Sequence, residues 1–193
     1  MTIPAPSTQS RDVAGRDDPA PDRAKLDFEA VYEAEFDYVW HTLRRLGADD
    51  GDLADLAHDV FLVAYRRLPH YDVARPIRPW LFGISYRVLA DERRRGRRKE
   101  IPGGAAIEVP DGAPPADEQA VRNQERDVLL RLLASLPIEL CAVLVLHDLE
   151  GRVATDIAQT LEIPMNTVYS RLRRAREAFA AAADRFRAGG GPR

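Results

Sequence analysis

The chain has 193 residues, of which 45% are hydrophobic and 31% are charged, and its formal net charge is −3. This size allows one medium or two small hydrophobic cores, and the negative charge excludes a protein that coats nucleic acid indiscriminately, because such binding depends on excess positive charge. No run of about 18 apolar residues indicates a membrane span, and the N-terminus lacks the apolar core of a secretory signal. A single cysteine, Cys141, cannot form an internal disulfide, and together with the missing secretory signal this leads us to expect a cytoplasmic protein. Cys141 is expected to be a small buried apolar residue.

The N-terminal half begins with a segment that cannot form a core. Residues 1–25 contain almost no large apolar side chains, which predicts a disordered tail. Apolar residues then recur at steps of three and four up to Leu46, and this pattern predicts an amphipathic helix that ends at Gly47. A second helix is predicted over DLADLAHDVFLVAYRRL, ending at Pro69, and a third begins near Pro79 and runs through an arginine-rich stretch.

The composition then changes abruptly. The segment EIPGGAAIEVPDGAPPADE has four prolines, three glycines and no sustained period, which indicates a flexible linker over residues 100–118. Helical spacing resumes up to Leu136, and Pro137 opens another apolar helix that ends near Gly151. VATDIAQTL is predicted as a short helix, EIPMN as a turn and TVYSRLRRAREAFAAAADRF as a final helix. Since no segment alternates like a strand, the sequence predicts an all-α fold with two helical domains.

The last two predicted helices have the outline of a helix-turn-helix, because a tight turn joins them and the second is basic. At about 100° per residue, Val168, Leu172 and Ala175 share one side of the final helix. An α-helix fits the major groove of DNA, where arginine can bind guanine with two hydrogen bonds. Merely solvated arginines are the alternative. The side chains on or near the exposed arc, with the last two nearer its edges, are Tyr169, Ser170, Arg173, Arg174, Arg171 and Arg176.

Two further patterns mark the N-terminal half. The second helix carries Asp52, Asp55 and Asp59 at steps of three and four, an acidic stripe that needs either solvent or a basic partner. From Tyr71 onward, aromatic side chains alternate with arginines, a composition that suits unstacked single-stranded bases. Trp80 is expected to pack mainly in the core.

The chain resembles the bacterial RNA polymerase sigma factors of the extracytoplasmic-function (ECF) group. SLP, DLEG, DIA and TVYSRLRRAR, between Ser135 and Arg176, are similar to region 4 of that family, and GDLADLAHDVFLVAYRRL and PWL are similar to region 2. Some positions depart from the family pattern. In region 4, Glu162 and Asn166 stand where glycine is usual, and Tyr169 stands where a basic residue is frequent. In region 2, asparagine is frequent at the position of Arg87, and Ala, Glu, Gln and Glu are common at those of Leu53, Ala54, His58 and Asp59.

The resemblance implies a function and a domain layout. It implies a sigma factor that binds core RNA polymerase and promoter DNA and directs promoter-specific initiation of transcription. It also implies that an anti-sigma factor holds the protein inactive. It implies no enzymatic activity, cofactor or metal. Region 2 is expected over residues 26–99, region 4 over residues 119–187 and a flexible tail over 188–193. Four linker acids are expected to mimic nucleic acid near the polymerase active-site channel: Glu108, Asp111, Asp117 and Glu118.

Three sets of site residues follow from the resemblance. The expected polymerase-binding residues are Asp55, Leu56, His58, Asp59 and Phe61. The residues expected to hold the melted minus-ten element are Tyr71, Arg75, Arg78, Trp80, Tyr86, Arg87, Arg93 and Arg94. Those expected to read the minus-thirty-five element are Asn166, Thr167, Tyr169, Ser170, Arg171, Arg173, Arg174 and Arg176.

Two other classes of protein compete with this interpretation. A conventional regulator would also use a helix-turn-helix, but its sensing domain would need no second basic surface. A helical metalloenzyme is suggested by Asp55 and His58, three positions apart, with Asp59 beside them. No partner motif is found for such a site around the other histidines.

Overall fold

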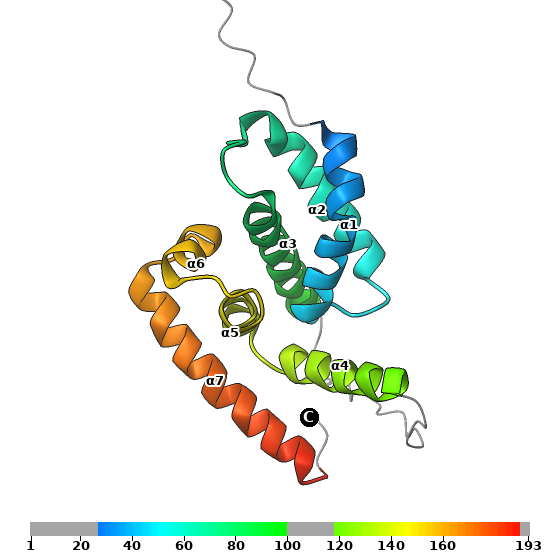
Figure 1. The fold of residues 1–193 in the computed structure, drawn as a ribbon, viewed down its shortest axis with the longest axis vertical. Helices are drawn as coiled ribbons and strands as arrows, with labels where there is room; N and C mark the ends of the chain where they lie inside the picture. The colour runs from blue at the N-terminus through cyan, green and yellow to red at the C-terminus, as the bar shows by residue number, and fades with distance from the viewer. Residues whose placement is uncertain (1–26, 100–117, 190–193) are drawn as a thin grey trace, which may run out of the picture.

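The computed structural model describes residues 27–99 and 118–189. The described chain is helical and contains no strand (Figure 1). Its α-helices are α1 (Phe28–Arg45), α2 (Leu53–Arg67), α3 (Ile77–Lys99), α4 (Glu118–Ala134), α5 (Ile138–Leu144), α6 (Ala154–Leu161) and α7 (Met165–Arg187). A 3₁₀ turn, Leu68–His70, follows α2, and a π-helical turn, Val145–Leu149, follows α5.

Two helix boundaries differ from the sequence prediction. Helix α3 begins at Ile77 rather than near Pro79, because a proline is tolerated within the first helical turn, where the backbone N–H has no intrahelical partner. Helix α7 begins at Met165, so Met165 and Asn166 are helical rather than part of the predicted turn. Pro164 directly precedes α7 with an extended backbone.

The N-terminal unit consists of α1, α2 and α3 packed side by side. Asp27 caps α1 by accepting a hydrogen bond from the backbone N–H of Glu29, and Gly47 ends the helix with φ at +84°. The guanidinium of Arg93 in α3 donates to the carbonyl oxygens of Leu46 and Gly47, at 3.2 and 2.6 Å. The predicted glycine stop is therefore confirmed, and Arg93 satisfies backbone oxygens at the end of α1.

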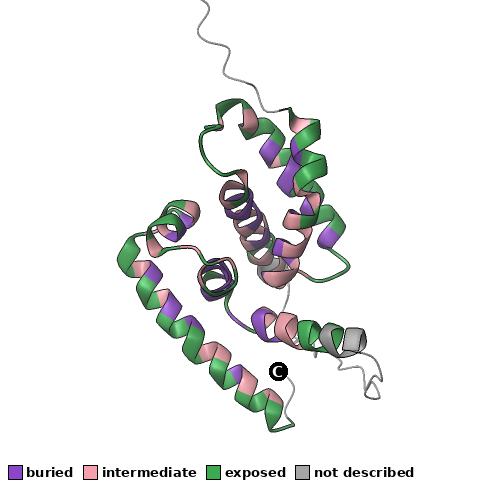
Figure 2. Ribbon diagram, in the orientation of Figure 1, coloured by how far each residue is buried: buried purple, intermediate pink, exposed green. Residues whose placement is uncertain are grey.

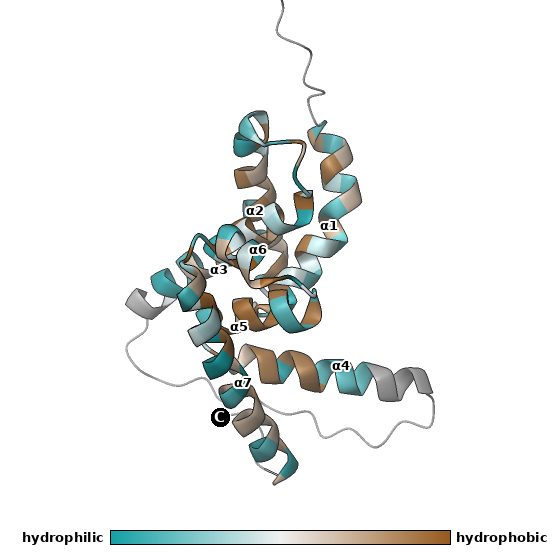
Figure 3. Cartoon of the chain, turned by 60° about the vertical axis from the view of Figure 1, so that its left-hand side comes forward, coloured by the Kyte–Doolittle hydropathy of each residue, from teal (hydrophilic) through white to brown (hydrophobic). Residues whose placement is uncertain are grey.

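The C-terminal unit places α6 and α7 around the apolar α5, which is drawn almost wholly in brown in Figure 3. The side chains of Val168, Leu172 and Ala175 on α7 are buried, as the helical period predicted. The turn after α6 passes through Glu162, which has φ at +56° and is the one non-glycine residue of the described chain with a positive φ. The turn therefore has a left-handed backbone at this position, with glutamate where the family usually has glycine.

The two units share one continuous hydrophobic core (Figure 2). Buried residues of α1 to α3, including Phe82, belong to the same cluster as Leu133, Cys141 and Leu146 of the C-terminal unit. Helix α6 lies against α3, and α4 lies against the end of α1 (Figure 1). Cys141 is fully buried, as expected, and its thiol donates to the carbonyl oxygen of Arg45 across the units, at 3.2 Å.

Some sequence predictions fall outside the described residues. These are the disordered tail 1–25, nearly all of the linker 100–118 with Glu108, Asp111 and Asp117, and the last four residues. Glu118 is the first residue of α4, but its side chain is not described. None of the described helices is long and apolar enough to cross a membrane.

Candidate nucleic-acid interface

Helix α7 presents a polar face away from the core. The side chains of Tyr169, Ser170, Arg173 and Arg174 are exposed, and Tyr169 is 56% accessible. Ser170 donates its hydroxyl to the carbonyl of Thr167 at 3.0 Å, and Arg173 pairs with Glu177 one turn later at 3.3 Å. Asn166 is exposed in the first turn of the helix. This face therefore has the shape and the donors that a major groove accepts.

The two edge arginines of α7 have partly internal roles. Arg176 binds the carboxylate of Asp148 at 2.6 Å, and that hydrogen bond holds the pKa of Asp148 below its ordinary value, although burial acts in the opposite direction. Arg171 is half-buried, and its Nη1 is buried without a hydrogen-bond partner. Arg176 therefore links α7 to the turn that follows α5 in the same unit.

Helix α2 separates the predicted polymerase-binding residues into two groups. Asp55, His58 and Asp59 are exposed, whereas Leu56 and Phe61 are buried at 5% and 3% accessibility. Phe61 packs its ring against Tyr32 of α1 at 4.7 Å between centroids. The buried pair therefore fixes α2 from inside, and only the three polar residues are free to meet a partner.

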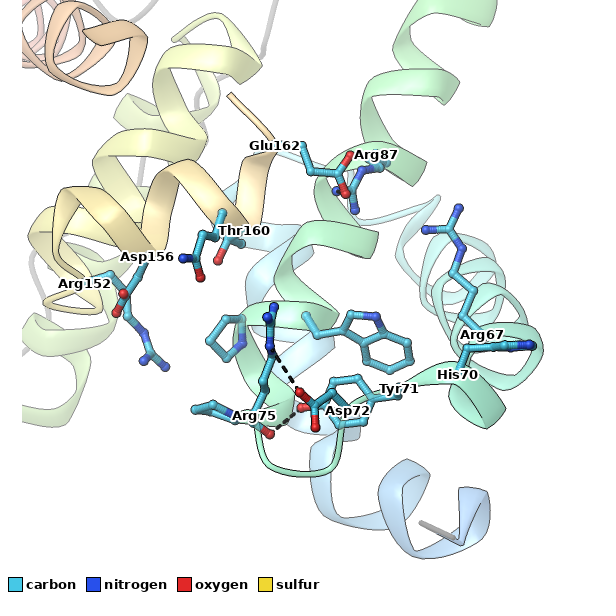
Figure 4. Close-up of a pocket in the computed structure, with 14 residues that line it drawn as sticks. Arg67, His70, Tyr71, Asp72, Arg75, Arg87, Arg152, Asp156, Thr160 and Glu162 are labelled. Atoms are coloured by element: carbon cyan, nitrogen blue, oxygen red, sulfur yellow. Dashed lines mark hydrogen bonds and ion pairs between the residues drawn. The ribbon is translucent and has the colours of Figure 1, made fainter. Parts of the chain in front are cut away.

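A cleft of about 540 Å³ opens between the two units (Figure 4). Four of the predicted minus-ten residues line it: Tyr71, Arg75, Trp80 and Arg87. The rings of Tyr71 and Trp80 lie 4.7 Å apart, and Trp80 is half-buried, so only one part of it packs in the core as the sequence suggested. Burial raises the pKa of Tyr71 above its ordinary value. Aromatic and cationic side chains are thus gathered around one hollow, the combination that suits stacked bases and phosphates.

The other four predicted minus-ten residues lie elsewhere. Arg78 pairs with Glu35 of α1 at 2.8 Å and lies over the ring of Tyr38. Tyr86 is half-buried against the core, and Arg93 holds the end of α1. Arg94 is exposed and pairs with Asp91 within α3. These residues do not join the cleft.

The cleft also contains cations that the sequence analysis missed. Arg67 ends α2 and Arg152 lies in the loop before α6, and both line the hollow. The Nε of Arg152 is buried without a hydrogen-bond partner. A signal for Arg67 existed, since it stands just before the aromatic and basic loop. Nothing in the local sequence marks Arg152, because it reaches the cleft only through the packing of the two units.

The family comparisons match both units. A model of sigma-70 region 2 matches residues 31–99, and a model of sigma-70 region 4 matches residues 126–179. The ECF sigma factor SigC of Mycobacterium tuberculosis is 30% identical over 158 residues, which cover 81% of this chain and 83% of the relative. The chain belongs to the ECF sigma factors. The ECF sigma-E factor of Escherichia coli is 29% identical over 138 residues, covering 67% of this chain and 72% of the relative.

Solved structures share the fold of this sigma factor. RpoE from Bartonella quintana, in complex with the anti-sigma factor NepR, has a TM-score of 0.58 at 19% identity and covers 79% of this chain and 94% of that one. CnrH, in complex with the cytosolic domain of CnrY, has a TM-score of 0.54 at 23% identity and covers 81% and 87%. Both likenesses support the two-unit helical fold.

The family decides between the competing classes. The match to region 2 in the N-terminal half excludes a conventional regulator with a sensing domain there. Sigma factors are non-enzymatic initiation factors that bind core RNA polymerase and direct it to promoters, so this sigma factor is not a metalloenzyme. In the part of the chain that the structure describes, no three histidine, cysteine or carboxylate side chains gather to hold a metal ion.

Proposed function

We propose that this sigma factor docks on core polymerase through the exposed acidic face of α2. Asp55, His58 and Asp59 supply that face, and Asp52 extends it at the start of the helix. An acidic stripe on a helix held rigidly from inside suits a basic partner, because charge complementarity speeds association and fixes orientation. Leu56 and Phe61 contribute by holding the helix in place.

The melted minus-ten element binds to the aromatic and basic wall of the cleft. Tyr71 and Trp80 offer ring faces to unstacked bases, and Arg75 and Arg87 offer cations to phosphates. Arg94, exposed further along α3, extends this basic surface. Arg78, Tyr86 and Arg93 hold α1 and α3 together rather than touching the strand.

The minus-thirty-five element binds to α7. The observation that best supports this proposal is the orientation of the helix. Its apolar stripe is buried, and Tyr169, Ser170, Arg173 and Arg174 are exposed on the opposite face. Asn166 and Thr167 meet the DNA backbone at the N-terminus of the helix, where backbone N–H groups favour phosphate. The working units are region 2 over residues 26–99 and region 4 over residues 119–187.

An anti-sigma factor controls this sigma factor, and the protein works in the cytoplasm, where bacterial polymerase acts. Two proteins of similar fold were solved with such partners or with a cytosolic domain. The partner is expected to abolish co-elution of the sigma factor with polymerase. A partner that binds the chain and leaves co-elution unchanged contradicts this control.

The proposal is tested by mixing the purified chain with core polymerase, without DNA, and separating the mixture by size-exclusion chromatography. Run-off transcription from a promoter library follows with the same complex. Co-elution with promoter-dependent transcripts is expected. Binding to duplex DNA without co-elution would contradict the proposed role of α2 in polymerase binding. Co-elution without promoter selection would contradict the proposed role of α7 in reading the promoter.

A further inference from the structure

The cleft between the two units has room for a small molecule. Its volume of about 540 Å³ lies within the range of roughly 300 to 1,000 Å³ that small-molecule sites occupy. The residues that line it come from the end of α2, the loop after α2, α3 and α6 with its flanking residues. A ligand seated in the cleft therefore contacts both units at once.

Helix α6 supplies one wall of the cleft with hydrogen-bonding groups. Asp156, Gln159 and Thr160 line it across from Tyr71 and Arg75 (Figure 4). The side chain of Asp156 is exposed, and no described residue forms an ion pair with it. A carboxylate, an amide and a hydroxyl can together accept from and donate to the edge of a nucleobase. The proposed binding of the minus-ten element uses none of these three groups.

The opposite wall supplies a stacking surface. The rings of Tyr71 and Trp80 lie 4.7 Å apart at 42° to each other, and both side chains are half-buried. Aromatic rings hold a nucleobase by its flat face, whichever base it is. Because the aromatic pair and α6 line the same hollow from different sides, a base stacked on the pair can direct its edge to α6.

The charges of the cleft leave a free cation beside the aromatic pair. Arg75 pairs with Asp72 at 3.5 Å, and Arg87 pairs with Glu162 at 2.6 Å, so these two arginines are already neutralised. Arg67 also lines the cleft, is exposed and forms no ion pair with any described residue. A guanidinium without a carboxylate partner is a preferred donor to phosphate.

We infer that this sigma factor binds a nucleoside triphosphate in the cleft, with the base between the aromatic pair and α6 and the phosphates on Arg67. Arg152, on the wall of α6, is a second lining arginine without an ion pair to a described residue and adds to the attraction of an anion. The site stands on the groups that line the cleft. Its competition with the promoter strand rests on the proposed function, because the strand and the base would both use Tyr71 and Trp80.

The fluorescence of Trp80 reports the binding. The chain has two tryptophans, so Trp40→Phe leaves Trp80 alone. GTP, added to this full-length variant without polymerase or DNA, is expected to quench the fluorescence saturably, with one molecule bound per chain. Guanosine is expected to bind about ten-fold more weakly or worse, because it lacks the phosphates. Calorimetry of the wild type with GTP checks the affinity, and no saturable binding by either method up to about 1 mM GTP overturns the inference.

The phosphate contact is tested with two neighbouring arginines of α2. Arg67→Gln is expected to weaken GTP binding about ten-fold, the loss typical of one charged hydrogen bond. Arg66→Gln is the matched control, because Arg66 is equally exposed and makes the same change in net charge but does not line the cleft. Equal losses in the two variants would mean that net charge alone attracts the nucleotide, and would overturn the site.

The base contact is tested with CTP and UTP, which differ in an amino group against a carbonyl oxygen. An ionised carboxylate can only accept a hydrogen bond, so the wild type is expected to bind CTP about five-fold more tightly than UTP. Asp156→Asn is expected to bring the two affinities together, since an amide can either accept or donate. Equal affinities in the wild type would overturn the placement of the base edge on α6.

The competition is measured separately from the site. A short mixed-sequence single-stranded DNA is expected to displace GTP from the wild type. Simultaneous binding of GTP and DNA would overturn the competition and would also count against the cleft as the minus-ten site. Failure of GTP to bind overturns the nucleotide site alone and leaves the transcription test of the proposed function unaffected.

Discussion

Glu162 combines backbone strain with a contact between the units. Its φ of +56° is unfavourable for a residue with a β-carbon, by about 1 to 2 kcal/mol, and its carboxylate binds Arg87 at 2.6 Å. The side chain of Glu162 is 73% accessible, so solvent weakens the pair. Glu162 therefore lowers the local stability of the turn through its backbone, while its carboxylate adds a weak ion pair with Arg87 of the other unit.

Replacing Glu162 by glycine and by glutamine distinguishes these two effects. Both variants lose the charge, but only Glu162→Gly relieves the backbone. We expect Glu162→Gly to exceed Glu162→Gln in the free energy of unfolding by about 1 kcal/mol, after the larger entropy of the unfolded glycine chain is subtracted. Urea titration of both full-length variants measures the difference. Equal stabilities would mean that the left-handed turn costs glutamate nothing.

Arg174 is the outward arginine of α7 with the simplest prediction. It is exposed on the face opposite Val168 and Leu172, which is the face proposed to enter the major groove. Arg174→Ala is expected to weaken binding to the preferred promoter by about 1 to 3 kcal/mol and to relax selectivity at one position. Fluorescence anisotropy of the polymerase complex on matched and mismatched duplexes measures both, with Arg185→Ala near the other end of α7 as control. A uniform loss on every sequence would identify Arg174 as a phosphate contact.

At the scale of the element, the spacing of apolar residues in the sequence predicted most of the helices. It could not predict features that depend on contacts between residues far apart in the chain. The stop of α1 at Gly47 and the buried stripe of α7 follow from local rules, and both are observed. The π-helical turn Val145–Leu149 has no local signature. The cleft could not be predicted either, because the ion pair at its edge joins residues 75 positions apart.

Helix α2 carries the prediction for polymerase binding. Reversing two charges of its exposed face, with Asp55→Lys and Asp59→Lys together, places like charges opposite a basic partner and is expected to weaken co-elution with core polymerase about ten-fold or more. Asp55 lies in the first turn of α2, where the helix dipole stabilises a negative charge, so the substitution by lysine also removes a stabilising interaction. Thermal unfolding of the double variant therefore checks that the protein remains folded.

The control for α2 carries the same change in net charge on other helices. Asp37→Lys and Asp184→Lys alter exposed residues of α1 and α7, respectively, and are expected to leave co-elution intact. If both double variants lose polymerase equally, net charge rather than the α2 face governs the association.

At the scale of the whole molecule, Glu150 gives the contact between the units a dependence on pH. Its carboxylate accepts the hydroxyl of Tyr38 at 3.1 and 3.2 Å, and Arg45 lies 3.9 Å away. Burial raises the pKa of Glu150 above its ordinary 4.5, although the hydrogen bond from Tyr38 and the charges of Arg45, Arg152 and Arg78 act in the opposite direction. The folded chain therefore binds this proton more tightly than the unfolded chain does.

The sign of the pH effect follows from that raised pKa. The contribution of protonated Glu150 is fully present below the unfolded value of 4.5 and is lost as the pH rises through the higher folded value. Glu150→Gln cannot titrate, so the wild-type minus variant difference in unfolding free energy is expected to fall with rising pH across this window. Urea titrations at several pH values measure it, with Asp184→Asn, in an exposed pair within α7, as the control that leaves the slope unchanged. A difference that rises with pH would mean that Tyr38 and the arginines outweigh burial, and the contact between the units would then favour the charged carboxylate.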